Sequence, residues 1–324
     1  MDVIDIHAHI YPQRYLELVR GIVKNDRTVW GRHASFLLEN RISVNPAMWD
    51  VQAHIDAMDQ AGVEIQALSL PIPQAYLEDE AQAVEAARIT NDAIAELCTK
   101  YPDRFKGMPI LPLPHVDAAL RELDRCINGL GMHGLMLGAN VRGIPLDDER
   151  FLSLWAEIDR LNLAVLLHPV TPPAYEELLD YDLTTGVGFL MDGAVATLRL
   201  VNAGIFETCQ SVKFIVPHMG AYIFGGWDRL QGGGRMAVDV EGAPRAISKP
   251  TGEYLKTLYY DTATPNQRLW PVALDTVGAD HIVFGTDYPF VPGYENAVAS
   301  VNKAGLSESD RQAVLGGTAA QLLR

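Results

Sequence analysis

Cysteine is scarce in this sequence. Its 324 residues include only Cys98, Cys126 and Cys209, which lie far apart and form no Cys-x-x-Cys pair. An odd number of widely spaced cysteines argues against a disulfide-stapled scaffold. Long uncharged apolar runs are also missing, and the N-terminus lacks the basic and apolar regions of a signal peptide. We therefore expect reduced thiols and a cytoplasmic protein.

Basic residues are outnumbered. The chain has 26 lysines and arginines against 41 aspartates and glutamates, which gives a net charge of −15. Because nucleic acids and anionic membranes are bound by basic surfaces, this balance argues against both kinds of partner. It leaves open a small anionic substrate, which needs only a local arginine.

A glycine-rich phosphate loop is the third absence. No G-x-G-x-x-G follows a predicted strand, and the three glycines at 232–234 follow a predicted helix, where we expect a mobile loop. Instead, short apolar runs alternate with helical patterns along the chain, which is typical of parallel α/β folds. The predicted strands are 3–10, 63–70, 105–113, 134–138, 163–169, 212–218, 258–261 and 281–287.

Eight such strands, with no Pro/Gly/Ser-rich linker between them, predict one (β/α)₈ TIM barrel that forms a single domain over residues 1–324. The alternative is a doubly wound open sheet, which needs fewer strands and usually a phosphate loop. The connection 11–45 is long and polar, with weak helical periodicity near 15–23. We expect it to be a loop insertion that builds a lid or a pocket wall.

Two helices carry clear end signals. Asp50 is expected to cap a helix that Gly62 ends, and Ser307 is expected to cap the closing helix, 307–323. The first helix precedes the predicted strand 63–70, and the second follows the predicted strand 281–287.

The first predicted strand contains the pair His7 and His9. Because alternate side chains of a strand share a face, both imidazoles should project together, with Ile6, Ala8 and Ile10 on the opposite face. Two imidazoles at one strand end can begin a metal chelate. Taken alone, the pair fits equally well with two polar positions on a half-buried strand.

Further ionisable residues end other predicted strands: His168 ends the fifth, His218 the sixth and Asp287 the eighth. Since barrel active sites lie at the C-terminal ends of the strands, these residues should converge with the first histidine pair. A packed core histidine would explain any one of them. Four histidines and an aspartate at the same end indicate a metal site.

Four segments resemble the amidohydrolase superfamily, and more narrowly its metal-dependent decarboxylases of the α-amino-β-carboxymuconate-ε-semialdehyde decarboxylase type. They are DIHAH at 5–9, LHP at 167–169, PHMG at 217–220 and GTDYPF at 285–290. The stretch 49–70 is similar as well, so the resemblance runs almost the full length of the chain.

The resemblance implies that His7, His9, His168 and Asp287 bind a metal and that His218 is the acid/base beside it. Binuclear members of the superfamily bridge two ions with a modified lysine on strand four, and 134–138 contains no lysine. One divalent ion is therefore expected. The nitrogen and carboxylate ligands favour Zn²⁺ and also admit Mn²⁺.

The resemblance also suggests substrate-binding residues. Arg229 corresponds to an arginine that reaches a neighbouring protomer's site, which implies a homodimer. Arg41 falls near a substrate-binding arginine, with an ordinary exposed loop arginine as the equal alternative. Phe290, with Tyr288 and Trp49, could wall a pocket for a planar acid, or these aromatics could simply pack.

The resulting hypothesis is a non-oxidative decarboxylase of an aromatic or unsaturated, muconate-like carboxylic acid, with Asp287 as ligand and proton carrier. One alternative is a hydrolase of a C–N, C–O or C–C bond on the same ligands. A catalytically idle metal-binding scaffold is the third possibility, and the additional His218 argues against it. The loop 171–187 lacks the tryptophans of the decarboxylase and therefore does not indicate the same substrate.

Overall fold

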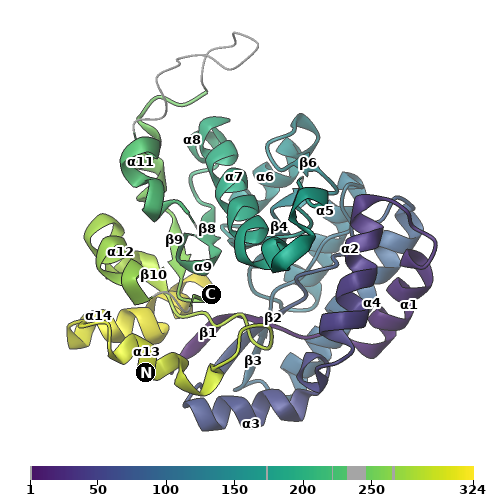
Figure 1. Ribbon diagram of the computed structural model, residues 1–324, viewed down its shortest axis with the longest axis horizontal. Helices are drawn as coiled ribbons and strands as arrows, with labels where there is room; N and C mark the ends of the chain where they lie inside the picture. Colours follow the sequence, from purple (N-terminus) through teal and green to yellow (C-terminus); the bar gives the residue numbers. More distant parts are fainter. Residues whose placement is uncertain (1, 173, 221, 232–245, 265–266) are drawn as a thin grey trace.

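The computed structural model describes residues 2–172, 174–220, 222–231, 246–264 and 267–324 (Figure 1). Within these ranges, eight parallel strands follow one another along the chain, separated by helices. They are β1 (Ile4–His9), β2 (Ile65–Ser69), β3 (Phe105–Gly107), β4 (Leu135–Gly138), β7 (Ala164–His168), β8 (Lys213–Val216), β9 (Tyr259–Asp261) and β10 (Ile282–Val283). The short strands β5 (Asn140–Val141) and β6 (Ile144–Pro145) form an antiparallel hairpin that the sequence did not predict.

The eight parallel strands form two sheets, ordered β1-β2-β3 and β10-β9-β8-β7-β4. Further backbone hydrogen bonds join the sheet edges. At one seam Ile6 N donates to Phe284 O at 2.9 Å and Asp287 N to His7 O at 2.7 Å, and at the other His133 N donates to Gly107 O at 2.7 Å and Met136 N to Pro109 O at 3.0 Å. The strands therefore follow chain order around a ring, and its two seams are bridged by backbone hydrogen bonds that lie partly outside the strands. All eight predicted strands are present, several of them shorter than predicted.

Helices surround the strands in Figure 1. They are α1 (Gln13–Val23), α2 (Val29–Leu37), α3 (Val51–Ala61), α4 (Glu80–Lys100), α5 (Val116–Asp124), α6 (Leu152–Arg160), α7 (Phe189–Asn202), α8 (Ile205–Thr208), α9 (Pro217–Gly220), α10 (Trp227–Leu230), α11 (Thr251–Leu255), α12 (Trp270–Val277), α13 (Ala297–Asn302), α14 (Glu308–Gln312) and α15 (Thr318–Leu322). None of them, in the described part of the chain, is long and apolar enough to cross a membrane.

The predicted helix ends are confirmed. The Asp50 side chain accepts a hydrogen bond from Gln52 N at the start of α3, and Gly62 ends this helix in the left-handed conformation at φ 71°. Ser307 accepts from Asp310 N at the start of α14. The predicted closing helix consists of α14 and α15 with a π-helical turn between them.

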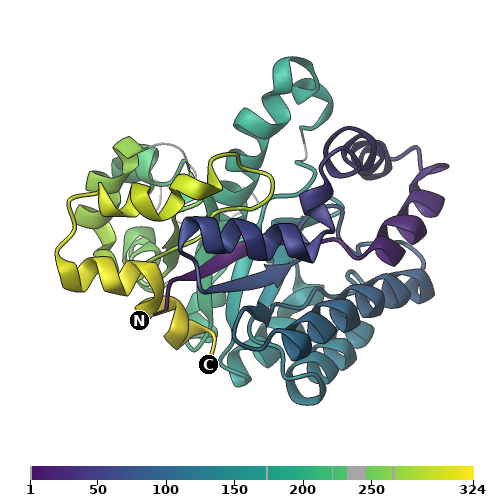
Figure 2. The same cartoon turned by 90° about the horizontal axis from the view of Figure 1, so that it is seen from below.

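The connection after β1 contains more helix than its sequence predicts, since α1, α2 and the π-helical turn η1 (Leu38–Ile42) occupy most of it. In Figure 2 this purple segment and the teal segment that precedes α7 rise from the same side of the strands. Ion pairs join them, Arg32 with Glu176 and Arg41 with Asp182. The glycines at 232–234 lie outside the described residues.

Strand β1 contains a register shift around its first histidine. Its pairing with β2 shifts register between Asp5 and Ala8, so β1 holds one extra residue there. Ile4 and Ile6 pack in one apolar cluster, which includes inward residues of other strands, whereas Ala8 and Ile10 pack in the other. The prediction that Ile6 shares a face with Ala8 and Ile10 was wrong, because a β-bulge re-aims the strand at this point.

Candidate metal centre

Four buried side chains meet at the C-terminal ends of the strands. His7 and His9 extend from β1, His168 ends β7, and Asp287 follows β10. One ligand atom of each lies within 4.8 Å of the others, an arrangement that could hold a metal ion. The predicted convergence of these residues is therefore present.

The four facing atoms have no hydrogen-bond partner. They are His7 Nε2, His9 Nε2, His168 Nε2 and Asp287 Oδ1. The carboxylate oxygen lies 3.6, 3.0 and 3.8 Å from the three nitrogens, respectively, without hydrogen-bond geometry. A buried polar atom without a partner costs about 1–3 kcal/mol. Three imidazole nitrogens and one carboxylate oxygen that share this deficit fit a divalent ion such as Zn²⁺ or Mn²⁺.

The outer nitrogens of the rings set the tautomers. His168 Nδ1 lies 2.7 Å from Pro169 O, an acceptor only, so this nitrogen carries the proton. His9 Nδ1 lies 3.1 Å from Ser69 Oγ, and the Ser69 hydroxyl donates to Ala8 O, so it accepts from His9. Both rings therefore present an unprotonated Nε2 to the cluster, which is the form that binds a metal.

Asp261, at the end of β9, supports the third ring. Its Oδ2 lies 2.6 Å from His7 Nδ1, and its Oδ1 accepts hydrogen bonds from His218 N at 2.8 Å and Ala263 N at 2.9 Å. The sequence prediction missed this residue as a functional one. Its position was the available signal, because Asp261 ends the predicted seventh strand on the same ring as the other site residues.

His218 follows β8 in a left-handed backbone conformation, with φ 56° and ψ 45°. Its Nδ1 donates to Ala263 O at 2.9 Å, so Nε2 is the nitrogen that can exchange a proton. The ring centroid lies 5.5 Å from that of His7 and 6.2 Å from that of His168. His218 is thus adjacent to the cluster without being one of its four members.

Burial and mutual contact shift the pKa values of the cluster. Burial lowers the pKa of His9 well below its usual range and also lowers that of His168. Burial alone would raise the pKa of Asp287, but the facing His168 and His9 rings outweigh it and hold that pKa far below normal. His9 and His168 are therefore favoured as neutral imidazoles beside an ionised Asp287. Burial also opposes the charge on His7, but Asp261 and Asp287 outweigh it and raise the pKa of His7 to about 8, so a metal that binds this ring must displace a proton.

A cavity of about 320 Å³ opens above the cluster. It is lined by Leu37, Asn40, Arg41, Val44, Asn45, Met48, Ile72, His168, Thr185, Phe189, His218, Asp287, Pro289, Phe290 and Val291. Arg41 therefore lies in the cavity wall, where its guanidinium is 3.1 Å from Asp182. The Phe290 ring lies 5.9 Å from that of His9. Most of the remaining lining is apolar.

The sequence profile of the amidohydrolase family matches residues 4–324. The chain belongs to this family. Gamma-resorcylate decarboxylase of Rhodococcus jostii strain RHA1 is 33% identical over 294 residues, which cover 85% of this chain and 88% of that protein. The 2-amino-3-carboxymuconate-6-semialdehyde decarboxylase of Dictyostelium discoideum is 26% identical over 332 residues, covering 99% and 91%.

The amidohydrolase fold is also evident from solved structures. The crystal structure of 5-carboxyvanillate decarboxylase from Sphingomonas paucimobilis superposes with a TM-score of 0.91 at 23% identity, covering 100% of this chain and 99% of that one. The family resemblance and the barrel fold predicted from the sequence are confirmed.

Not every predicted pocket residue lines the cavity of this amidohydrolase. Trp49 and Tyr288 are outside its lining, and the Tyr288 ring packs against His54 at 4.8 Å and Tyr294 at 4.6 Å. The packing alternative holds for Tyr288. Arg229 is exposed on α10 and does not line the cavity within a single chain, so its predicted role toward a neighbouring protomer stays a prediction.

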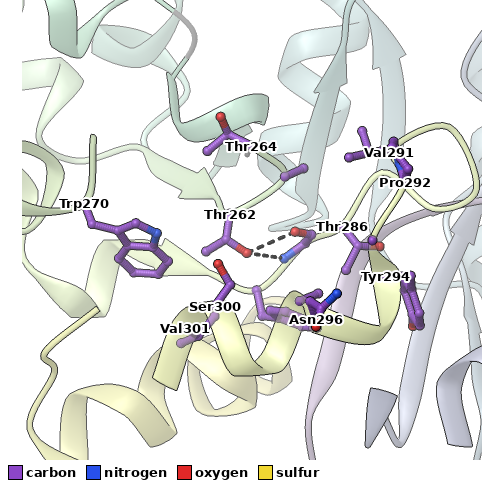
Figure 3. A pocket seen from close by; sticks show the side chains of 15 residues that line it. Thr262, Thr264, Trp270, Thr286, Val291, Pro292, Tyr294, Asn296, Ser300 and Val301 are labelled. Carbon is purple, nitrogen blue, oxygen red and sulfur yellow. Dashed lines mark hydrogen bonds between the residues drawn. The ribbon is translucent and has the colours of Figure 1, made fainter. Parts of the chain in front are cut away.

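A second cavity of about 330 Å³ lies beside the metal cluster, between the ends of β9 and β10 and helix α13 (Figure 3). The Thr262 hydroxyl joins the two strand ends, donating to Gly285 O at 3.0 Å and accepting from Gly285 N at 3.1 Å. None of the described residues that line this cavity carries a charge. It therefore lacks the groups that would bind and transform an anionic substrate.

Proposed function

We propose that this amidohydrolase is a metal-dependent, non-oxidative decarboxylase of an aromatic or unsaturated, muconate-like carboxylic acid. The observation that carries the proposal is the set of four partnerless buried ligand atoms beneath a cavity that His218 and Arg41 also line. The relatives of 33% and 26% identity, both named as decarboxylases of such acids, support it.

In this proposal His7, His9, His168 and Asp287 hold one divalent ion, with Zn²⁺ favoured and Mn²⁺ as the alternative. A bound ion would polarise the substrate carboxylate or a neighbouring oxygen and so stabilise negative charge that develops near the reacting carbon. The donor set contains no thiolate, which leaves both metals open.

The remaining steps fall to the protein's own groups. Loss of CO₂ leaves an electron pair on carbon, and a proton must reach that carbon. His218 would move this proton through Nε2, because its Nδ1 donates to Ala263 O. Asp287 is the second group that could carry a proton beside the ligand cluster.

Substrate binding is assigned to the cavity wall. Arg41 would bind the substrate carboxylate, since a guanidinium pairs with a carboxylate through two hydrogen bonds. Phe290 and the apolar residues around it would hold a planar ring and exclude water from the reacting carbon.

The hydrolase alternative uses the same ligands and differs in its product. The decisive experiment measures CO₂ released from a panel of hydroxybenzoic and muconate-type acids by protein of known metal content. We expect release that disappears with a chelator and returns with Zn²⁺ or Mn²⁺. Bound metal without CO₂ release, together with cleavage of esters, amides or vinylogous diketones, would contradict the decarboxylase and support the hydrolase.

We also propose a cytoplasmic homodimer in which Arg229 reaches the partner's cavity. The exposed position of Arg229 on α10, outside the cavity of its own chain, is compatible with this role. Light scattering during size-exclusion chromatography should give twice the chain mass of 35.6 kDa. A monomer with full activity would refute the proposal.

A further inference from the structure

We propose that Asp261 is the positioning residue of this site: one buried carboxylate fixes both the tautomer of the ligand His7 and the backbone of His218. The inference rests on the metal site of the proposed function and adds a residue to it. Asp261 touches neither the cavity nor the four converging ligand atoms, so it acts through its two neighbours.

The contacts of Asp261 require a pure acceptor. Its side chain is completely buried and receives three N–H groups: His7 Nδ1 at 2.6 Å, His218 N at 2.8 Å and Ala263 N at 2.9 Å. A backbone N–H can only donate. The carboxylate is therefore satisfied on both oxygens by donors, and a donor group in its place would meet another donor.

The contact with His7 determines which ring nitrogen faces the cluster without a proton. When Asp261 Oδ2 accepts from Nδ1, the proton stays on Nδ1 and the Nε2 lone pair points to the other ligands. Ser69 and Pro169 O do the same for the other two rings through weaker, neutral acceptors. Of these three hydrogen-bond acceptors, Asp261 is the charged one.

The contact with His218 stabilises an uncommon backbone conformation. A non-glycine residue at φ 56° is strained, and the hydrogen bond from His218 N to Asp261 Oδ1 offsets this strain. The same oxygen also holds Ala263 N, and Ala263 O accepts from His218 Nδ1. Asp261 thus holds the His218 backbone directly and, through the backbone of Ala263, the acceptor of the His218 ring.

The isosteric variant Asp261→Asn tests this arrangement. Its amide has one acceptor oxygen, which the backbone N–H groups of His218 and Ala263 would occupy, so its NH₂ would face His7 Nδ1. That nitrogen would then have to accept, which moves the ring proton to Nε2 and into the ligand cluster. Metal binding must expel this proton, and so Asp261→Asn should bind metal more weakly although its shape is preserved.

Asp261→Ala should be less harmful than Asp261→Asn to metal affinity. The smaller side chain leaves room for water, which can accept from His7 Nδ1–H and keep the productive tautomer. A merely structural role predicts the reverse order, since a cavity destabilises a buried site more than an isosteric change does. The order of the two variants therefore separates tautomer control from packing.

Asp5→Asn is the matched control. Asp5 is also a buried carboxylate near His7, and it accepts from the backbone N of His7 and from the backbone and hydroxyl of Thr286. It contacts no imidazole nitrogen, and the Thr286 hydroxyl can reorient to accept from the new amide. The change in chemistry is the same, without an effect on a ring tautomer.

The experiment titrates each metal-free protein with Zn²⁺ against a chromophoric chelator. We expect about 10–100-fold weaker binding for Asp261→Asn, the range typical of lost partners of metal ligands, a smaller loss for Asp261→Ala and a change within about threefold for Asp5→Asn. ¹⁵N NMR of histidine-labelled, metal-free protein, recorded at a pH at which the His7 ring is neutral, should show its single ring proton moved from Nδ1 to Nε2 in Asp261→Asn alone.

Wild-type affinity in Asp261→Asn, or a greater loss in Asp261→Ala than in Asp261→Asn, would overturn the inference. Equal losses in Asp261→Asn and Asp5→Asn would do so too. A wild-type protein that binds no zinc or manganese would instead overturn the proposed metal site, so the two failures are distinguishable. Metal binding without CO₂ release would leave Asp261 in place and refute only the reaction.

Discussion

The metal cluster and the mouth of the cavity, where the segments of Arg41 and Asp182 meet, differ in how firmly their side chains are held. Around the cluster, buried acceptors hold the outer nitrogens of His7, His9 and His168. At the mouth, the ion pair of Arg41 with Asp182 has side chains that are 48% and 59% exposed. Exposed pairs contribute about 0–1 kcal/mol, so the mouth can rearrange at little cost while the cluster cannot. In the proposed function, the groups that carry the reaction are thus held rigidly and the proposed substrate-binding arginine is held loosely.

Removal of a cluster ligand should have the largest effect. His168→Ala deletes one of the four converging atoms and leaves the others partnerless, so we expect loss of bound metal and of CO₂ release. Elemental analysis of purified protein measures the metal, and circular dichroism checks the fold. Full metal content in a folded His168→Ala protein would show that the ion binds elsewhere.

His218→Ala should separate binding from chemistry within the same region. The four ligand atoms remain, so the metal should be retained, whereas turnover should fall about 10²–10⁴-fold, as is typical when a proton-transfer group is lost. His115→Ala is a control, because that ring contacts Leu77 O and does not line the cavity. Retained turnover in His218→Ala would remove this residue from its assigned role.

Arg41→Ala probes the mouth. Loss of a charged hydrogen bond to a carboxylate costs about 1.5–3 kcal/mol, so KM should rise about 10–100-fold with little change in kcat. Steady-state kinetics on the best acid of the panel measures both. Arg32→Ala is the matched control, since Arg32 pairs with Glu176 at the same mouth but does not line the cavity. A similar KM increase in both variants would mean that Arg41 acts only by closing the mouth.

His33 is a buried anchor of the mouth, and its pH response should be measurable as a change in the free energy of unfolding. Its Nδ1 lies 2.9 Å from Thr171 Oγ1, its ring packs against Tyr175, and burial lowers its pKa to about 4. The unfolded chain takes up this proton below about pH 6.5, whereas the folded chain does so only near pH 4. Stability is therefore lost as the pH falls through this window, by up to about 2 kcal/mol between pH 7 and pH 5.

Urea unfolding of metal-free wild type and His33→Gln at pH 7 and pH 5 measures this effect. The variant cannot titrate at this position, so its stability should fall less between the two pH values. The same loss in both proteins would assign the acid sensitivity to other groups. Of the four predicted effects this is the smallest, and it concerns the mouth alone.

The sequence was most informative where chain order alone determines position. Because parallel strands end at one edge, His168, His218 and Asp287 could be placed beside the first two histidines without any knowledge of packing. Asp261 stands at the same edge and was missed, since its role depends on which atoms it meets. An aspartate that supports a ligand resembles any other strand-end aspartate in the sequence.

Two further differences arise from tertiary structure. The register shift in β1 lets Ile6 and His7 break the alternation that a two-residue period predicts, and nothing in the residue types indicates the extra residue. The connection after β1 forms α1 and α2 despite its weak periodicity, because these helices bury Tyr15 and Trp30 against the barrel. Packing, and not local preference, decides the structure there.

The left-handed backbone at His218 and Asp287, with φ 56° and 61°, bears on any attempt to make this protein more heat-resistant. A common engineering route replaces left-handed residues by glycine, which adopts such angles without strain. At these two positions glycine would remove side chains that the proposed reaction needs, so a gain in stability would come with a loss of activity. Asn162, at φ 52° in the turn before β7, has the same geometry away from the cavity and is the safer place to begin.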